Sequence, residues 1–234
     1  MIRNITSVNQ DRVLEAFRQE AGALTDAVTG LSPAEWSLPT RCTPWSVLDL
    51  LGHVCIVIDW IPGMLDAPAP REPEISAAEY YRPDERFSPR TNDGRIALAQ
   101  DRAARSADGA AFVEDFAVTW QRVDRLCRVQ QDGRTVRTRH GDAMLLSEFL
   151  LTRVVEVAVH GLDLADALGR KPWLTSAAGD VVAELLLGRE HAMATGELGW
   201  SRTRFLRKAT GREPLDDTEA VQVEQLGIRW LALG

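Results

Sequence analysis

Two segments of this chain are apolar almost all round over the length of a long helix. The first begins near residue 45 and reads WSVLDLLGHVCIVIDWI, and the second, over residues 145–168, reads LLSEFLLTRVVEVAVHGLDLADAL. A helix without a polar face is stable in water only when other elements cover it on all sides. The chain must therefore supply further helices that surround these two.

Two other long segments have the three- and four-residue apolar spacing of amphipathic helices. They cover residues 11–29 and 93–129, the second with a possible break at Asp108 and Gly109. Four long helices joined by mostly short connections are typical of a four-helix bundle, so we predict an all-α fold. We expect the first buried helix to begin with Thr43 as N-cap and Pro44 at its first position, and Gly169 to end the second.

The rest of the chain divides into a loop and an extension. Residues 67–92 carry five prolines and many charges, which indicates either a binding loop or a solvated linker. Residues 173–234 contain three shorter helical segments near 175–188, 201–210 and 216–226. We therefore expect a bundle over residues 1–172, with 67–92 as a loop insertion, and a short, mainly helical C-terminal extension over 173–234.

Composition excludes several classes of function. The formal net charge is −7 over 234 residues, which argues against nucleic acid or an anionic membrane as partner. The three cysteines are too few and too scattered for a disulfide framework, which fits a reducing cytoplasm. We find no signal peptide and no run of about 18 apolar residues, so we expect a cytoplasmic protein without a membrane span.

Each of the two apolar segments carries one narrow stripe of polar residues. In the later segment the stripe consists of Arg153, Glu156, His160 and Asp163, which fall within roughly 80° of one another on a helix. A buried helix must satisfy such groups inside the protein. Glu156 and His160 are four residues apart, so both side chains reach one point, as two metal ligands on a helix do.

The earlier segment has the same arrangement, with Asp49 and His53 on one face. If the two helices face each other, His53 completes a ligand set with Glu156 and His160. Two histidines and a carboxylate leave coordination positions open, which is typical of catalytic metal sites. Asp49 or Asp163 is then expected to accept a hydrogen bond from an imidazole and orient it.

A structural explanation competes with the metal site. A single histidine on an apolar helix is more often a satisfied core residue, and acid–histidine pairs at this spacing are common. Two independent polar stripes on two apolar helices are less common and favour a divalent metal. The donor set suits zinc, nickel, iron or manganese.

Three stretches resemble a known family. LSPAEWSLPTRCTPWSVLDLLGHV resembles the opening of the mycothiol-dependent maleylpyruvate isomerase family, a branch of the DinB-like superfamily. RVVEVAVHGLDLADALGR resembles the later helix of that family, and FLRKATGREPL and LGIRWLALG are similar to tails of related chains. The resemblance implies a DinB-like four-helix bundle with a divalent metal, usually zinc, held by His53, Glu156 and His160.

The resemblance also implies chemistry. Family members use a low-molecular-weight thiol such as mycothiol, and the metal would hold its sulfur as a thiolate that attacks an electrophilic carbon. The result is either cis–trans isomerisation or net thiol transfer, and no catalytic residue beyond the metal ligands is implied. We expect Cys42 to be structural and Cys55 to point away from the site.

The C-terminal part departs from the family, in which a separate α/β domain helps to bind a dicarboxylate. Here the extension carries a basic cluster that either holds substrate carboxylates or forms a solvated face balanced by nearby acids. The cluster comprises Arg202, Arg204, Arg207, Lys208 and Arg212. The candidates for binding thiol or substrate are Arg153, Trp45, Tyr81, Arg204 and Arg207. Asp163 is a further candidate for binding the sugar of the thiol.

We therefore predict a metal-dependent enzyme that uses a thiol. Two other functions remain as alternatives. One is a metal-dependent hydrolase on the same bundle, with metal-bound water as nucleophile. The other is a non-catalytic bundle that binds a small molecule. The expected partners are a thiol and a small electrophile, and the chain is expected to be a monomer or homodimer.

Overall fold

The computed structural model describes residues 9–82, 84–85, 88–188 and 196–226. Residues 1–8 of the expected bundle and most of the LGIRWLALG tail lie outside the described residues. Pro83 and residues 86–87 of the expected loop insertion lie outside them as well.

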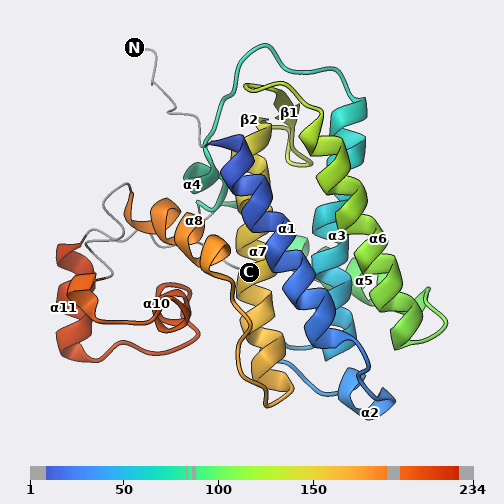
Figure 1. Ribbon diagram of the computed structural model, residues 1–234, viewed down its shortest axis with the longest axis vertical. Helices are drawn as coiled ribbons and strands as arrows, with labels where there is room; N and C mark the ends of the chain where they lie inside the picture. The colour runs from blue at the N-terminus through green and yellow to red at the C-terminus, as the bar shows by residue number, and fades with distance from the viewer. Residues whose placement is uncertain (1–8, 83, 86–87, 189–195, 227–234) are drawn as a thin grey trace.

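Four long helices form the bundle: α1 (Gln10–Val28), α3 (Val47–Asp66), α6 (Gly109–Arg128) and α7 (Leu146–Ala167). Each packs against two of the others, in the cyclic order α1, α7, α3 and α6 (Figure 1). The two nearly all-apolar helices, α3 and α7, are neighbours in this ring, and almost every residue of α7 is buried. The predicted all-α bundle is confirmed.

The predicted start of α3 is wrong. Its N-cap is Ser46, whose Oγ accepts a hydrogen bond from the Asp49 backbone N–H, while Thr43 and Pro44 lie in the preceding turn. The Asp49 carboxylate accepts in return from the Ser46 backbone N–H (3.0 Å) and Oγ (2.7 Å). Ser46 is the better N-cap than Thr43 because Asp49, three residues later, completes a capping box with it.

The helical segment predicted over 93–129, with a possible break at Asp108 and Gly109, is two helices. α5 (Pro89–Ala104) lies along α3, and α6 begins after the predicted break, with Asp108 as its N-cap. A Cβ atom on Gly109 would lie 1.9 Å from Nε1 of Trp36, so only glycine fits where α6 passes α2 (Pro33–Trp36). Trp36 is buried, and its ring lies against Gly109 at the start of α6.

The proline-rich segment is more ordered than a linker. It contains α4 (Ala77–Tyr80), and its last residues already belong to α5. Backbone N–H groups of Glu74 and Ile75 donate to the carbonyl oxygen of Ala143. This ties the segment to an antiparallel hairpin of β1 (Thr135–Arg137) and β2 (Ala143–Leu145).

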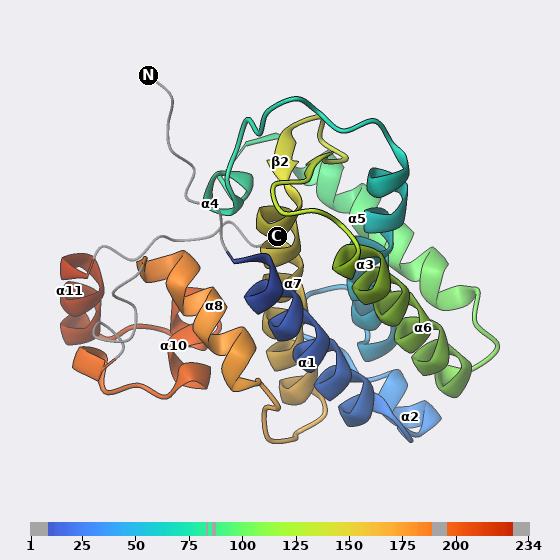
Figure 2. The same cartoon turned by 45° about the horizontal axis from the view of Figure 1, so that its top comes forward.

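The extension contains α8 (Ser176–Leu187), α10 (Arg202–Ala209) and α11 (Asp217–Gln225), close to the three predicted segments. α8 packs against α1 and α7, and α10 packs against α8 and, less extensively, α7. Figure 2 shows α10 and α11 beyond α8 on the same side of the bundle. The domain boundary at residue 172 stays a prediction.

The expectation of no membrane span stays a prediction, because one helix passes a looser test of length and composition for such a span. Within the described residues, α3 has the length and apolar composition of one. Of that segment, 61% is buried inside the protein, where α5, α6 and α7 cover it. α3 therefore has the environment of a central bundle helix.

Candidate metal centre

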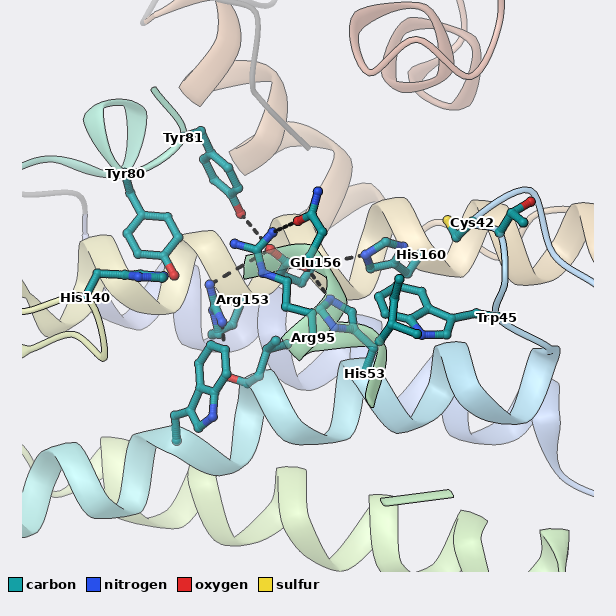
Figure 3. Close-up of a pocket in the computed structure, with 15 residues that line it drawn as sticks. Cys42, Trp45, His53, Tyr80, Tyr81, Arg95, His140, Arg153, Glu156 and His160 are labelled. Carbon is teal, nitrogen blue, oxygen red and sulfur yellow. Dashed lines mark hydrogen bonds and ion pairs between the residues drawn. The ribbon is translucent and has the colours of Figure 1, made fainter. Parts of the chain in front are cut away.

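His53 on α3 and Glu156 and His160 on α7 converge where the two helices face each other (Figure 3). His53 Nε2 lies 3.2 Å from Glu156 Oε2, and His160 Nε2 lies 3.4 Å from the same oxygen. One ligand atom from each residue lies within 4.8 Å of the others. Donors bound tetrahedrally to zinc at about 2.0–2.1 Å are about 3.3 Å apart, so these residues fit such an ion.

Neighbouring side chains hold both imidazoles in place. Trp45 stacks on His53 with ring centroids 4.8 Å apart and an interplanar angle of 25°. His160 Nδ1 lies 3.0 Å from Asp163 Oδ2. A carboxylate can only accept, so Nδ1 carries the proton and Nε2 faces Glu156. This is the contact expected for Asp163, whereas the Asp49 carboxylate accepts hydrogen bonds in the cap of α3 and contacts no imidazole among the described residues.

The electrostatics of the cluster favour anionic Glu156. Burial alone would raise the pKa of Glu156, but hydrogen bonds from His160 and His53 and the charge of Arg153 hold that pKa well below its usual range. Burial lowers the pKa of His53. Burial would also lower the pKa of His160, but hydrogen bonds to Asp163 and Glu156 raise it well above its usual value. A cation bound here must therefore displace a proton from His160.

A cavity of about 150 Å³ opens beside the cluster. Trp45, Tyr81 and Arg153, all predicted as binding residues, line it. The Tyr81 hydroxyl donates to the carbonyl oxygen of Thr152 (2.9 Å) and lies 3.5 Å from Glu156 Oε1. Three of the five predicted binding residues therefore share one cavity with the metal cluster.

The other two predicted binding residues do not line the cavity. Arg204 contacts Glu219 (3.1 Å) at the surface, and Arg207 forms a two-fold contact with Asp166 (2.6 Å to each oxygen). For these two arginines the alternative of a surface balanced by acids is the correct one. The spacing of charges along the sequence did not show which residues of the basic cluster point toward the bundle.

The sequence from residue 17 to 165 matches the family model described as the mycothiol maleylpyruvate isomerase N-terminal domain. The chain belongs to this family. A crystal structure of the mycothiol-dependent maleylpyruvate isomerase is 15% identical, with a TM-score of 0.50, over 80% of this chain and 73% of that one. A mutant of that isomerase gives 16%, a TM-score of 0.49, and 75% and 68% coverage. Comparison with curated proteins gives no match.

The family match and the structural similarity support the helical fold, but at 15% identity they do not establish the lining of this cavity. Sequence reasoning missed Arg95 on α5 and His140 in the turn between β1 and β2, which both line it. Trp60 lines it as well, with the Arg139 guanidinium 4.5 Å from its ring centroid. Arg95 and His140 belong to neither polar stripe, and only the packing of α5 and of the hairpin brings them to the cavity, whereas Trp60 lies on α3 two turns after His53.

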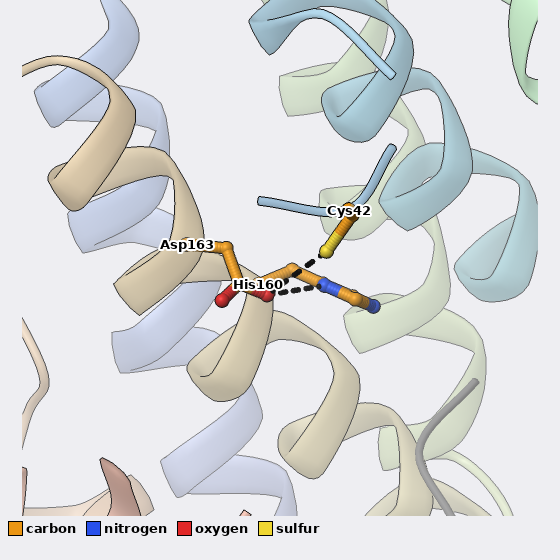
Figure 4. Close-up of side chains that lie close together, drawn as sticks. All are labelled: Cys42, His160 and Asp163. Atoms are coloured by element: carbon orange, nitrogen blue, oxygen red, sulfur yellow. Dashed lines mark hydrogen bonds and ion pairs between the residues drawn. The ribbon is translucent and has the colours of Figure 1, made fainter. Parts of the chain in front are cut away.

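The cysteines occupy different surroundings. Cys42 lines the cavity, and its Sγ donates to Asp163 Oδ2 over 3.4 Å (Figure 4). Cys42 was predicted to be a structural residue, but it lies beside the candidate metal ligands. Cys55 contacts Thr119 on α6 and does not line the cavity, which agrees with the prediction.

Proposed function

We propose that this protein is a metal-dependent enzyme that activates a low-molecular-weight thiol, mycothiol or a close relative, for attack on an electrophilic small molecule. The observation that carries the proposal is the convergence of His53, Glu156 and His160 at one end of a cavity. A divalent metal, zinc in our proposal, would supply a Lewis acid that keeps a thiol sulfur deprotonated at neutral pH. We place the protein in the cytoplasm, where thiols are kept reduced.

The protein's own residues prepare the site. Asp163 fixes the ring of His160, and stacking on Trp45 fixes that of His53. The aromatic walls, Trp45, Trp60 and Tyr81, exclude bulk water and therefore strengthen charge interactions inside.

The charges in the cavity favour an electrophile that carries a carboxylate. Arg95 and Arg153 line the cavity, and Glu156 is the only acidic residue among the lining residues described. Arg153 is fully buried, donates to the carbonyl oxygen of Val57 (3.1 Å), and lies 4.0 Å from Glu156. A divalent ion adds positive charge, so an anionic substrate restores the balance. We therefore propose Arg95 and Arg153, in place of Arg204 and Arg207, as the residues that bind the substrate anion.

Both candidate reactions begin alike. The thiolate sulfur forms a bond to an electrophilic carbon, and the electron pair of the double bond moves onto the activating carbonyl. In an isomerase, rotation occurs about the carbon–carbon bond that the addition has made single. The carbon–sulfur bond then breaks, which restores the double bond and returns the thiolate. In an S-transferase a proton is added and sulfur stays attached. We propose this pair of reactions as the class, with the electrophile undefined.

The test is metal content followed by turnover. Wild-type protein purified without chelator should hold about one divalent metal per chain, and His53→Ala and His160→Ala should lose it. His140→Ala is the matched control, because His140 lines the cavity outside the ligand cluster. Metal loss in the control and retention in the two ligand variants would contradict the assignment.

Turnover separates the reaction classes. Maleylpyruvate and other unsaturated carboxylates should react only when mycothiol or another thiol is added. Cleavage of esters or amides in thiol-free buffer would favour the hydrolase. Metal and ligand binding without product under any condition would favour a non-catalytic binding protein.

A further inference from the structure

The carboxylate that orients His160 is itself held by a residue of the C-terminal extension. Arg212 Nε lies 3.1 Å from Asp163 Oδ1, and Arg212 Nη2 lies 2.9 Å from Asp163 Oδ2. Oδ2 is also the oxygen that accepts from His160 Nδ1. His160, Asp163 and Arg212 thus form a continuous triad that runs from the metal cluster to the extension.

This pair is buried, unlike most arginine contacts of the extension. The side chain of Asp163 is 0% exposed and that of Arg212 is 8% exposed. A two-fold arginine–carboxylate contact fixes the plane of the carboxylate, because both oxygens are engaged by a rigid guanidinium. The oxygen offered to His160 therefore has one orientation.

The backbone around Arg212 is clamped as well. Arg41, in the loop before α3, donates to the carbonyl oxygens of Arg212 (2.9 Å) and Gly211 (3.3 Å). Gly211 has a φ of 71°, a conformation that glycine adopts without strain. The Arg212 Nη1 group donates to the carbonyl oxygen of Thr210 (2.8 Å). These contacts place the guanidinium against Asp163 from a segment outside the bundle.

We propose that Arg212 is a positioning residue of the metal centre: through Asp163 it sets the orientation of His160, so the extension strengthens metal binding inside the bundle. The inference rests on the proposed role of His160 as a metal ligand. Groups that orient a ligand typically change metal affinity by about 10–100-fold when removed. Without Arg212, Asp163 would keep its contacts with Cys42 and His160 and the more distant Arg41 (3.9 Å), but it would lose the two-fold contact that fixes the plane of its carboxylate.

A neighbouring ion pair supplies a matched control. Arg207 also reaches α7 from the extension, with a two-fold contact to Asp166, one helical turn after Asp163. Within the described residues, no contact joins Asp166 to His160. Arg207→Ala therefore removes a second, more exposed clamp between extension and bundle, and it keeps the Arg207 carbonyl that accepts from the Arg212 backbone N–H (2.6 Å) and all three side chains of the triad.

The experiment compares zinc affinity of the full-length wild type, Arg212→Ala, Arg212→Lys and Arg207→Ala by competition with a chromogenic chelator. We expect affinity about 10–100-fold weaker in Arg212→Ala, partial recovery in Arg212→Lys, and wild-type affinity in Arg207→Ala. The visible spectrum of bound Co²⁺ should change in Arg212→Ala and not in Arg207→Ala. Circular dichroism and thermal melting check that each variant is folded.

The outcomes separate the two proposals. Wild-type affinity in a folded Arg212→Ala would overturn the inference and leave the proposed function intact. Equal losses in Arg207→Ala and Arg212→Ala would also overturn it, because docking of the extension alone would then explain the effect. A wild-type protein that binds neither zinc nor Co²⁺ would overturn both proposals.

Discussion

Glu20 places a buried carboxylate in the middle of α1. Its Oε2 accepts hydrogen bonds from the backbone N–H (2.9 Å) and the hydroxyl (2.6 Å) of Thr175, the N-cap of α8. Oε1 is buried with no hydrogen-bond partner among the described residues. Burial raises the pKa of Glu20, an effect that the two bonds to Thr175 only partly offset. The ionised form of Glu20 is therefore disfavoured in the folded protein.

Glu20→Gln should stabilise the protein at neutral pH by about 1 kcal/mol, or about 2–4 °C in Tm. Glutamine keeps an acceptor for Thr175 and removes the buried charge. Because the folded pKa of Glu20 is raised, its ionisation costs stability as pH rises through that value, and the cost is absent well below the unfolded value of about 4.3. Thermal melts should therefore converge near pH 4 and separate by pH 8.

Glu15→Gln on the same helix is the control, with the opposite sign. Hydrogen bonds from Arg18 and Gln19 lower the pKa of the exposed Glu15 to about 2. Its small stabilising effect is present above pH 4 and is lost as pH falls toward 2. A wild type that is more stable than Glu20→Gln at pH 8 would contradict the burial argument.

At the residue scale, the sequence predicted the cluster from two polar stripes, since buried polar groups at helical spacing must meet one another. It assigned Asp49 wrongly, because an acid three residues after Ser46 serves equally well as a cap. It could not predict the contact of Arg212 with Asp163, which lies 49 residues away in sequence. No local pattern distinguishes Arg212 from the surface arginines beside it.

The helices α3 and α5 approach each other closely at Gly52. A Cβ atom on Gly52 would lie 2.7 Å from the carbonyl oxygen of Ala99 on α5. Gly52 precedes His53, and α5 also carries Arg95, which lines the cavity. The absence of a side chain at position 52 therefore sets the distance between the metal cluster and one wall of the cavity.

Gly52→Ala should destabilise the protein by about 1–3 kcal/mol, because the added methyl group forces backbone apart in a packed interface. Gly63→Ala is the matched control in the same helix, since nothing lies within 4 Å of its added Cβ atom. It should gain up to about 1 kcal/mol from helix propensity. Urea denaturation measures both, and equal effects of the two substitutions would contradict the close-contact argument.

At the element scale, apolar periodicity located the long helices because burial and helical geometry impose the same spacing. The glycine at position 109 marked the end of α5 and the start of α6 correctly as a possible break. Periodicity could not show that α5 lies outside the ring of four, because its position depends on the contact at Gly52. The conformation of the proline-rich segment likewise depends on a distant contact, in which the Ala143 backbone N–H donates to the carboxylate of Glu74, 69 residues away in sequence.

For the whole molecule, the bundle and the extension share a core. Val181, Val182, Leu185 and Leu186 of α8 are buried, and α8 packs against α1 and α7. Burying one such side chain is worth about 1.5–3 kcal/mol, and a whole protein is stable by only about 5–15 kcal/mol. The extension is therefore an integral part of the folded protein in energetic terms, whatever boundary the sequence suggests.

A chain truncated after residue 172 should lose cooperative folding. The truncation exposes the apolar faces of α1 and α7 and removes the partner of Glu20. We expect a broad thermal transition, increased binding of a hydrophobic dye, and self-association on size-exclusion chromatography. A sharp, monomeric, wild-type-like transition would instead support residues 1–172 as an independent domain.

The metal cluster is assembled from distant parts of the chain. His53 and Glu156 are 103 residues apart, and the helices that carry them are made far apart in time during synthesis. A nascent chain that ends before α7 has one of the three donors, which is too few to hold an ion tightly. If these residues bind the proposed metal, loading follows the docking of α7 on α3, and metal uptake by newly made protein would report when its fold is complete.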